Sequence, residues 1–411
     1  MTEAPRRAGM LRNVALLSTA QALANTSQGV LLAIVALVGY MLADNKAIAT
    51  LPHAVQWMGV MVFAVPVSLT MRRIGRRAGF IGGALLGTLA ALIAAHAVWI
   101  GSFWLFTAAL FVFGGFSATA MHYRFAAAEA ADEAWRSKAI SLVVGGGVVA
   151  AFIGPEIAKL TKDLLAPYTF VGTLLALGCV PLLLIAAAAF VRMPRAHDEH
   201  RRNDGPARPM AQIAAQPAFI VAVLSAVIGW GAMVLMMAST PIAMVTHGHH
   251  FDDAAFVIQW HIFGMYAPSF VAGWLIARFG VVNVLIAGLA LSTAAAVNGL
   301  LGMDVSNFWI ANICVGAGWN FLFVGGTTLL TYTYTPAERA KVQGVNDFLV
   351  FGTVAVFSFV SGWLQTTYGW YVVMVTILPL IGLVFCAVLW LRLKPGAAPA
   401  ALRPKRAAMA E

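Results

Sequence analysis

Twelve long apolar runs divide this chain of 411 residues, and each is close to the roughly 20 residues that a helix needs to cross a bilayer. Backbone N–H and C=O groups find no water in lipid, so a run of this length must satisfy them within its own helix. Charged residues make up 10% of the chain, where a soluble domain has roughly 25%. We therefore predict an all-α polytopic membrane protein with twelve transmembrane helices, at about 13–42, 50–71, 78–98, 101–124, 138–160, 169–192, 215–245, 253–277, 281–302, 307–333, 341–364 and 369–391.

The basic clusters between these runs occur twice. Arg73-Ile74-Gly75 returns 205 residues later as Arg278-Phe279-Gly280, and Arg136-Ser137-Lys138 returns 203 residues later as Arg339-Ala340-Lys341. Duplicated halves in a polytopic membrane protein are typical of secondary transporters, whose site lies where the repeats meet. The linker, rich in Pro, Gly and charges, is interpreted as a solvated tether. The predicted parts are a six-helix bundle at 1–192, a cytoplasmic linker at 193–214, a second six-helix bundle at 215–393 and a disordered cytoplasmic tail at 394–411.

Basic residues gather on one side of the predicted spans. Of the 26 lysines and arginines, 23 fall in segments on the same side as the N-terminus, and the other side has only Lys46, Lys159 and Lys162. The positive-inside rule then places both termini in the cytoplasm, in a multi-pass protein of the cytoplasmic (inner) membrane. Contact with the lipid bilayer explains the net charge of +10, so we expect no nucleic-acid partner.

The loop between the second and third spans carries the pattern Ser-Leu-Thr-Met-Arg-Arg-Ile-Gly-Arg-Arg at 68–77. This pattern resembles the loop signature of the major facilitator superfamily, Gly-x-Leu-x-Asp-Arg-x-Gly-Arg-Arg, and residues 273–280 resemble its first half. With the helix count and the long middle loop, the resemblance covers essentially the whole chain. It implies two pseudo-symmetric six-helix bundles that rock about a central cavity. The signature and gating positions are Ser68, Arg72, Arg73, Gly75, Arg76, Arg77, Gly273, Arg278 and Gly280.

The signature lacks its acid in this chain. In the superfamily, the Asp of this loop takes part in contacts that latch the cytoplasmic side shut. Here Arg72 stands at that position in the first copy and Ala277 in the second. Asp347 lies six residues beyond Lys341, or ~9 Å along a helix, which is shallow enough to reach a cytoplasmic loop. We hypothesise that Asp347 supplies the missing negative charge to the arginines of the first loop.

Acids inside the predicted spans are the other functional candidates, because a carboxylate in the membrane needs a partner. Asp347 fits a latch, a proton-binding site or a charge at the positive N-terminal end of its helix. Glu156 lies near the outer surface and three residues before Lys159, so an interfacial ion pair competes with a proton-coupling role. A carboxylate that binds a proton on one side and releases it on the other would make protons the coupling ion.

Polar side chains recur at helical spacing on the spans that line the cavity in the superfamily. Such stripes favour solute binding, although any single amide can instead join two helices by a hydrogen bond. Amides together with Trp and Tyr suit a neutral or weakly anionic, partly aromatic metabolite or vitamin-like solute. The candidates are Gln21, Asn25 and Gln28 in the first span, Trp230 in the seventh, Gln259, His261 and Tyr266 in the eighth, Asn312, Trp319 and Asn320 in the tenth, and Asn346 in the eleventh.

Other kinds of site find less support. The chain has no GxxxxGK[ST] segment for ATP and no credible Ser/His/Asp set, so we expect neither an enzyme nor a cofactor. The Thr-His-Gly-His-His-Phe-Asp-Asp loop at 246–253 is interpreted as solvated, with a metal-binding entrance as the alternative. Gly154-Pro155 resembles the Gly-Pro of proton-coupled drug antiporters, but the surrounding glycines mostly do not match.

Together these features predict a monomeric secondary active transporter that moves a small organic solute by alternating access, with uptake by proton symport. The alternative within this class is proton-coupled efflux of a drug or metabolite. The alternative of another class is a non-transporting membrane partner or an enzyme on the same fold.

Overall fold

The computed structural model describes residues 3–131, 133–191 and 207–393, and every regular element in these ranges is a helix. The predicted all-α class is therefore confirmed. The elements of the first half are α1 (Glu3–Leu42), η1 (Lys46–Ile48), α2 (Leu51–Ile74), α3 (Arg76–Trp99), α4 (Phe103–Ala120), α5 (Tyr123–Ala130), α6 (Glu133–Thr161) and α7 (Val171–Ala189). Those that follow are α8 (Met210–Ala214), α9 (Pro217–Thr246), α10 (Phe251–Tyr266), α11 (Ser269–Phe279), α12 (Val281–Leu301), α13 (Val305–Thr331), η2 (Pro336–Glu338), α14 (Arg339–Tyr368) and α15 (Trp370–Leu393).

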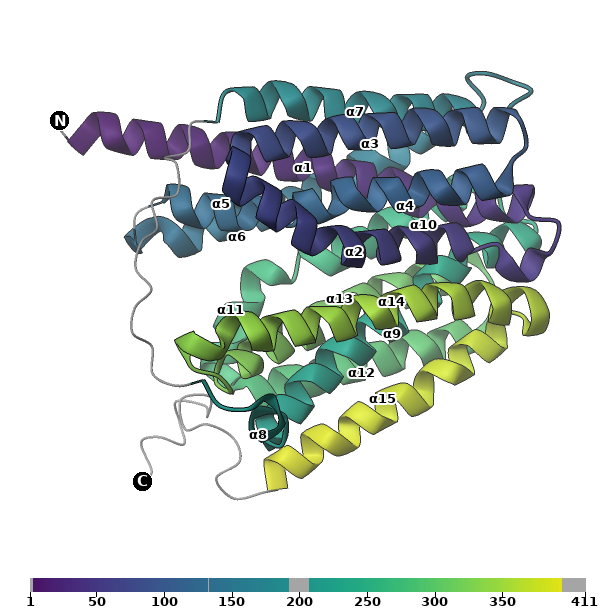
Figure 1. Ribbon diagram of the computed structural model, residues 1–411. Helices are drawn as coiled ribbons and strands as arrows, with labels where there is room; N and C mark the ends of the chain where they lie inside the picture. The colour runs from purple at the N-terminus through teal and green to yellow at the C-terminus, as the bar shows by residue number, and fades with distance from the viewer. Residues whose placement is uncertain (1–2, 132, 192–206, 394–411) are drawn as a thin grey trace.

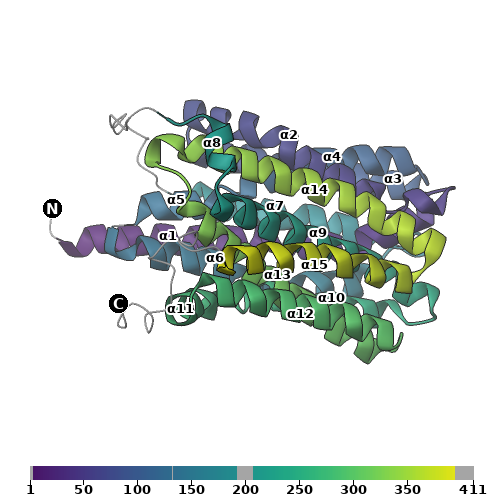
Figure 2. The same ribbon diagram turned by 90° about the horizontal axis from the view of Figure 1, so that it is seen from below.

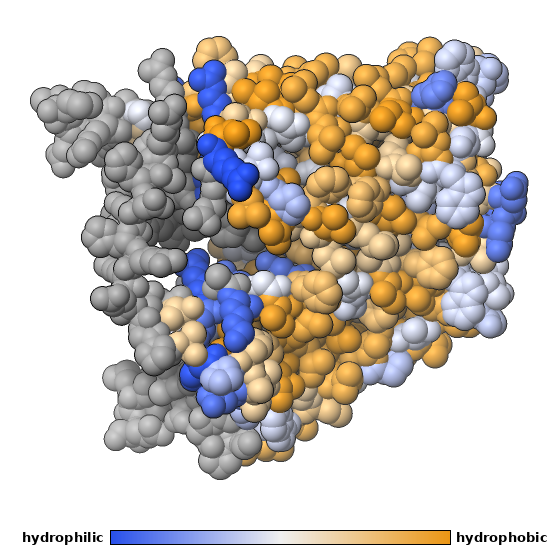
Figure 3. All heavy atoms as spheres, in the orientation of Figure 1, coloured by the Kyte–Doolittle hydropathy of each residue, from blue (hydrophilic) through white to orange (hydrophobic). Residues whose placement is uncertain are grey.

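Ten helices in the described ranges are long and apolar enough to cross a membrane, and the pair α10–α11, bent by 41°, would make an eleventh span. The predicted fifth span, 138–160, lies within α6, which is not among these ten, so the count of twelve stays a prediction. Figure 3 shows apolar side chains over most of the visible face, with hydrophilic ones gathered toward the left end. A surface of this kind suits the hydrocarbon core of a bilayer.

The duplicated basic clusters adopt the same backbone. Gly75 separates α2 from α3 with φ 89° and ψ 156°, and Gly280 separates α11 from α12 with φ 84° and ψ 152°. Glycine reaches a positive φ without steric cost, which explains why it occupies both turns. α12 begins 205 residues after α3, so the repeat in the sequence is also a repeat in the structure.

The two halves form separate bundles that meet mainly through two helix pairs. In Figure 1 most of the first half, purple to teal, lies above most of the second, teal to yellow. Within the first half α1 packs on α6, α2 on α4 and α3 on α7, and within the second α9, α10 and α12 each pack on α13. Across the halves, α2 packs on α14 and α6 packs on α10. Since α10 is the repeat of α2 and α14 the repeat of α6, the interface is itself pseudo-symmetric.

The first and last helices start and finish at the same end of the bundle. α1 begins and α15 ends at the left in Figures 1 and 2. The turns at Gly75 and Gly280, with their arginines, also lie at this end, because α2 and α11 run toward it. We name it the basic end, and the other the opposite end.

The halves are closed against each other at the opposite end. Thr50 Oγ1 donates a hydrogen bond to Phe359 O at 3.3 Å and accepts one from the Gly362 N–H at 3.1 Å. Lys162 Nζ of the first half lies 3.2 Å from Asp252 Oδ1 of the second. These contacts join the two halves on the side away from the chain termini.

The described end of the predicted linker is held on the second half, while its interpretation as a solvated tether stays a prediction for the remainder. Arg208 pairs with Glu338 through two contacts of 2.7 Å, Nε to Oε1 and Nη2 to Oε2. Arg208 Nη2 also donates to Thr333 O at 3.0 Å. The hydrogen bonds from Arg208 hold the pKa of the 1%-exposed Glu338 carboxyl well below its usual range. The rest of the predicted linker, 193–206, and the predicted tail, 394–411, lie outside the described residues.

Candidate functional site

Five aromatic side chains meet between the halves, and we name them the aromatic cluster. They are Trp57 of α2, Trp230 of α9, Trp319 and Phe323 of α13, and Phe351 of α14. Trp57 lies 5.6 Å from Trp230, nearly edge-on, and stacks on Phe351 at 5.8 Å and 11°. Trp230 lies 4.8 Å from Trp319, which stacks on Phe323 at 5.3 Å and 6°. Edge-to-face and offset parallel contacts are the favoured aromatic geometries. Since Trp57 comes from the first half, the cluster joins the two halves.

A polar face of α2 continues from this cluster. His53, Gln56 and Trp57 stand at i, i+3 and i+4, so their side chains share one face of the helix. Trp57 Nε1 donates to His53 Nε2 at 3.1 Å, and Gln56 Nε2 donates to Gln28 Oε1 of α1 at 2.8 Å. The polar face therefore connects the aromatic cluster with the predicted amide stripe of α1.

The α1 amides are brought together as predicted from their spacing. Gln21 Nε2 donates to Asn25 Oδ1 at 2.9 Å, and Gln28 accepts from Gln56 one turn farther along. All three α1 amides are half-buried, so part of each remains accessible. A row of amides of this kind offers both donors and acceptors to a polyhydroxylated solute.

Asn320 holds the bend between α10 and α11. Its Nδ2 donates to Met265 O and to Ser269 Oγ, both at 2.6 Å. The last carbonyls of a helix have no partner within it, so a side chain from α13 satisfies the end of α10. The ring of Tyr266 next to this bend lies against Gly147 of α6, where a side-chain carbon would be 2.6 Å from the Tyr266 ring. The predicted Tyr266 thus lies on the interface between the halves.

Two other predicted residues connect helices of the second half. Asn312 Nδ2 donates to Thr240 Oγ1 at 3.0 Å and to Phe308 O at 2.9 Å, and its backbone carbonyl lies 2.9 Å from His261 Nδ1. Asn312 is completely buried with both amide hydrogens engaged, which favours the helix–helix alternative for its side chain. Gln259 is half-buried on the same helix as His261.

Several buried polar atoms of the aromatic cluster and of the polar residues described above have no hydrogen-bond partner in the described part of the chain. A buried donor or acceptor without a partner costs roughly 1–3 kcal/mol, so such atoms favour a ligand that supplies the partner. Two of these atoms are indole N–H donors, one is an imidazole nitrogen that can donate, and two are amide oxygens that can accept. These atoms are Trp230 Nε1, Trp319 Nε1, His261 Nε2, Gln56 Oε1 and Asn320 Oδ1.

Neither of the predicted ionisable candidates belongs to the aromatic cluster. Lys159 Nζ lies 2.8 Å from Glu156 Oε1 at the opposite end, which is the ion pair that their spacing predicts. Asp347 is exposed near the basic end and accepts from Asn346 Nδ2 at 3.2 Å. The latch between Asp347 and the loop arginines, like the proton role of either acid, stays a prediction.

The signature loops lie at the basic end. Arg73 and Arg77 are exposed, Arg76 and Ser68 are half-buried, and the side chain of Arg72 lies outside the described residues. In the second copy, Arg278 covers the rings of Trp274 and Phe279, with guanidinium-to-centroid distances of 5.7 and 5.6 Å. Gly273 has open space around it.

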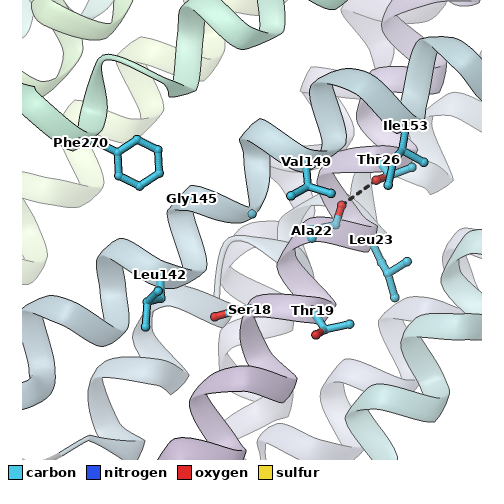
Figure 4. A pocket seen from close by; sticks show the side chains of 11 residues that line it. Ser18, Thr19, Ala22, Leu23, Thr26, Leu142, Gly145, Val149, Ile153 and Phe270 are labelled. Carbon is cyan, nitrogen blue, oxygen red and sulfur yellow. Dashed lines mark hydrogen bonds between the residues drawn. The ribbon is translucent and has the colours of Figure 1, made fainter.

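A groove of about 560 Å³ lies outside this site, between α1 and α6 with Phe270 of α11 at its edge (Figure 4). The hydroxyls of Thr19 and Thr26 in its wall donate to carbonyls of their own helix. Leu142 and Val149 line it and are each 53% exposed. The groove is apolar and opens onto the surface of the bundle, so it suits lipid chains rather than a polar solute.

The histidine-rich loop at 246–253 uses its side chains locally. His247 Nδ1 lies 2.7 Å from Ala243 O, and His249 Nε2 lies 2.7 Å from Met303 O. His250 and Asp253 form a capping box at the start of α10. Most of the loop is exposed, and within the described residues no group of three metal-binding side chains gathers there.

The residues that α2 contributes to the site, and two of its phenylalanines, were not predicted from the sequence. His53, Gln56 and Trp57 carry the same helical spacing that identified the α1 stripe, so the signal was present in 50–71. Phe323 and Phe351 gave no such signal, because an aromatic residue in an apolar run is usually a packing residue.

Comparison of the sequence with known proteins points to the same family as the loop signature. A family model described as Major Facilitator Superfamily matches residues 17–267 and 254–410. The chain is 39% identical over 389 residues to the riboflavin transporter RfnT of Brucella anthropi, covering 95% of this chain and 98% of that protein. It is 28% identical over 335 residues to the uncharacterized MFS-type transporter YddS of Bacillus subtilis, covering 76% of each.

Solved structures share the fold at low sequence identity. A bacterial homologue of the human lysosomal transporter Spinster, inward-facing and occupied, aligns with a TM-score of 0.68 at 13% identity and covers 97% of this chain and 100% of its own. The transporter FucP in its outward conformation aligns with a TM-score of 0.58 at 15% identity, covering 93% and 99%. With the duplicated bundles and their joined interface, these matches identify the chain as a member of the major facilitator superfamily, a multi-pass membrane transporter of a small solute and not an enzyme.

Proposed function

We propose that this transporter takes up riboflavin, or a flavin closely related to it, by alternating access at the interface of its two halves. The observation that carries the proposal is the aromatic cluster, which lies between the halves and includes two indole N–H donors, Trp230 Nε1 and Trp319 Nε1, without a partner in the described part of the chain. The 39% identity to a riboflavin transporter over nearly the whole chain supports it.

The chemistry of riboflavin fits both parts of this site. Its isoalloxazine is a flat three-ring system with carbonyl and N–H groups at one edge, and aromatic side chains bind such rings by stacking. Trp230 Nε1, Trp319 Nε1 and Gln56 Oε1 supply donors and an acceptor for that edge. The ribityl chain carries hydroxyl groups, which the α1 amides can bind. In the closed arrangement the rings pack on one another, so the solute enters as the halves separate.

The charge around the cluster favours a neutral flavin over its phosphate esters. Among the described residues, the Lys and Arg side chains that lie over an aromatic ring are Lys46, Lys162 and Arg278, and none of their rings belongs to the aromatic cluster. A phosphate group in this position would be desolvated without a cationic partner, which is costly. We therefore expect flavin mononucleotide to compete poorly with riboflavin.

The orientation and the coupling belong to the same proposal. The positive-inside rule places the basic end in the cytoplasm of an inner membrane, so the opposite end faces the periplasm. The closed contacts at Thr50 and Lys162 then lie on the periplasmic side. We propose that protons drive uptake, that Asp347 serves the latch on the cytoplasmic side, and that the protein works as a monomer.

Uptake of labelled riboflavin into proteoliposomes, with binding followed by quenching of flavin fluorescence, tests this function. Trp230→Ala should weaken binding about 5- to 150-fold, because stacking on an aromatic side chain is worth roughly 1–3 kcal/mol. Trp104→Ala, at a position 67% exposed on α4, is the matched control and should leave binding unchanged. Absence of riboflavin binding by the parent protein, or equal losses in both variants, would overturn the proposal. Accumulation only in inside-out vesicles would instead favour efflux.

A further inference from the structure

A buried histidine beside the aromatic cluster is held in one protonation state. Trp57 Nε1 lies 3.1 Å from His53 Nε2, and an indole N–H can only donate a hydrogen bond. His53 Nε2 is therefore the acceptor, so the imidazole is neutral and its proton is on Nδ1. His53 is 2% exposed, and Nδ1 has no partner in the described part of the chain.

Trp57 is also part of the closed gate at the opposite end. Thr50, at the start of α2, is joined to α14 through Gly362, and Trp57 stacks on Phe351 of the same helix. His53 lies between them, about one helical turn from each. The start of α2 thus carries two residues that contact the second half, Thr50 and Trp57. It also carries His53, which accepts the hydrogen bond from Trp57.

We propose that His53 is a proton-binding site whose occupancy controls this gate. A proton can add to the neutral ring only at Nε2, the atom that already accepts from Trp57. The imidazolium has two N–H donors and no acceptor, so the Trp57 bond and the added proton exclude each other. Proton uptake therefore releases the indole from His53 and weakens its stacking on Phe351. By reciprocity, closing the gate expels the proton.

Few titratable groups on the neighbouring helices lie at the same depth along the bundle as His53. α4 and α9 carry none, α1 and η1 present Tyr40 and Lys46, α3 presents His96 and α14 presents Tyr368. Lys46 Nζ donates to the carbonyls of Tyr40 and Ala43, both at 2.7 Å. The remaining charged groups with described side chains on the helices that pack on α2 lie toward the basic end, and they are Arg12, Arg76, Arg77, Arg339, Lys341 and Asp347.

This inference rests on the proposed orientation and assigns a direction to coupling. With the gate open, His53 is reachable from the periplasm and takes up a proton. With the gate closed, Trp57 occupies Nε2 and the proton leaves toward the cytoplasmic side. Solute and proton then travel in the same direction, which is symport, and the coupling site is a histidine in α2 rather than either membrane carboxylate.

Two variants separate titration from packing. His53→Gln keeps an acceptor near the position of Nε2 but does not titrate, and Trp57→Phe keeps the ring but removes its N–H. Riboflavin uptake by the parent should rise as the external pH falls from about 8 to 5.5, the range in which imidazole titrates. Uptake by His53→Gln should be flat over this range, and Trp57→Phe should stay active to a more alkaline pH. A pH profile of His53→Gln that matches the parent overturns the proposal.

A second measurement needs no solute. Lys162→Cys and Asp252→Cys, in a background with Cys179, Cys314 and Cys386 replaced by Ser, report gate closure through a short thiol cross-linker. The cross-linked fraction at pH 5.5 relative to pH 8 should be lower with His53 present than in His53→Gln, a comparison that cancels the pH dependence of the thiols. Equal ratios overturn the proposal. A His53-dependent ratio without riboflavin uptake would reject the substrate and keep the proton site.

Discussion

The rings of Trp57 and Phe351 lie 11° from parallel with their centroids 5.8 Å apart, although they belong to different halves of the protein. Each half therefore contributes one ring to a stacked pair across the interface. Under the proposed alternating access, opening of the bundles at the opposite end separates these two rings, so their contact energy biases the equilibrium between the two open states.

Replacing Phe351 by Leu should shift the gate toward its open state. An aromatic pair is worth about 0.5–1.5 kcal/mol beyond its buried area, which corresponds to a change of roughly 2- to 13-fold in the closed-to-open ratio. Cross-linking of cysteines at positions 162 and 252 measures this ratio. Phe348→Leu, at a position 61% exposed on the same helix, is the control and should leave it unchanged.

Gly154→Ala should destabilise the first half. A side-chain carbon at Gly154 of α6 would lie 2.9 Å from the Cα of Gly29 on α1, and a backbone atom has little room to give way. Overpacking of this kind costs about 1–3 kcal/mol, which thermal unfolding in detergent would register as a lower Tm. Gly352→Ala on α14, with nothing within 4 Å, should not lower Tm, and an equal loss there would contradict the packing argument.

Glu338→Gln should lower thermal stability by releasing the end of the linker from the second half. Bonding from Arg208 lowers the pKa of Glu338, so its stabilising contribution is present above the unfolded value of about 4.3 and is lost as the pH falls toward the folded value. The difference in Tm between parent and variant should therefore stay constant from pH 8 to about 5 and shrink below about pH 4. Asp163→Asn, at an exposed acid in the α6–α7 loop, should show no such difference.

Asp347→Asn tests the proposed latch at the basic end. Removal of the charge should raise the fraction of molecules open at that end, because the loop arginines would lose their acidic partner. Accessibility of a single cysteine placed in the loop at 72–77 measures this fraction. An unchanged distribution of states would exclude Asp347 from the latch and leave its other two interpretations.

Local patterns were enough to predict most of the fold. Long apolar runs must be helices in lipid, and the equal offsets of two basic clusters identified the repeat that the turns at Gly75 and Gly280 now share. The bend between α10 and α11 was not predicted, since a proline at 268 bends a helix only where neighbours such as Asn320 donate hydrogen bonds to the carbonyls that the bend frees. The anchoring of Arg208 was also missed, because Glu338 is 130 residues away.

The site was predictable where its members share one helix. The α1 amides follow from their spacing, and the hydrogen bond between Gln21 and Asn25 agrees with it. The pairing of Trp57 with Phe351 depends on how two bundles dock, and no periodic pattern within a single helix encodes that. His53 was not predicted for a related reason. Its proposed role depends on its hydrogen bond to Trp57, which in turn stacks on Phe351 of the other half.

The contact between Thr50 and α14 constrains which positions can change during evolution. Its hydroxyl binds the backbone carbonyl of Phe359 and the backbone N–H of Gly362, so it recognises the main chain of α14 and none of its side chains. A side-chain carbon at Gly362 would clash with that hydroxyl. Side chains elsewhere along this part of α14 can therefore diversify to suit different solutes while the closure survives, provided that a hydroxyl at 50 and a bare backbone at 362 are retained.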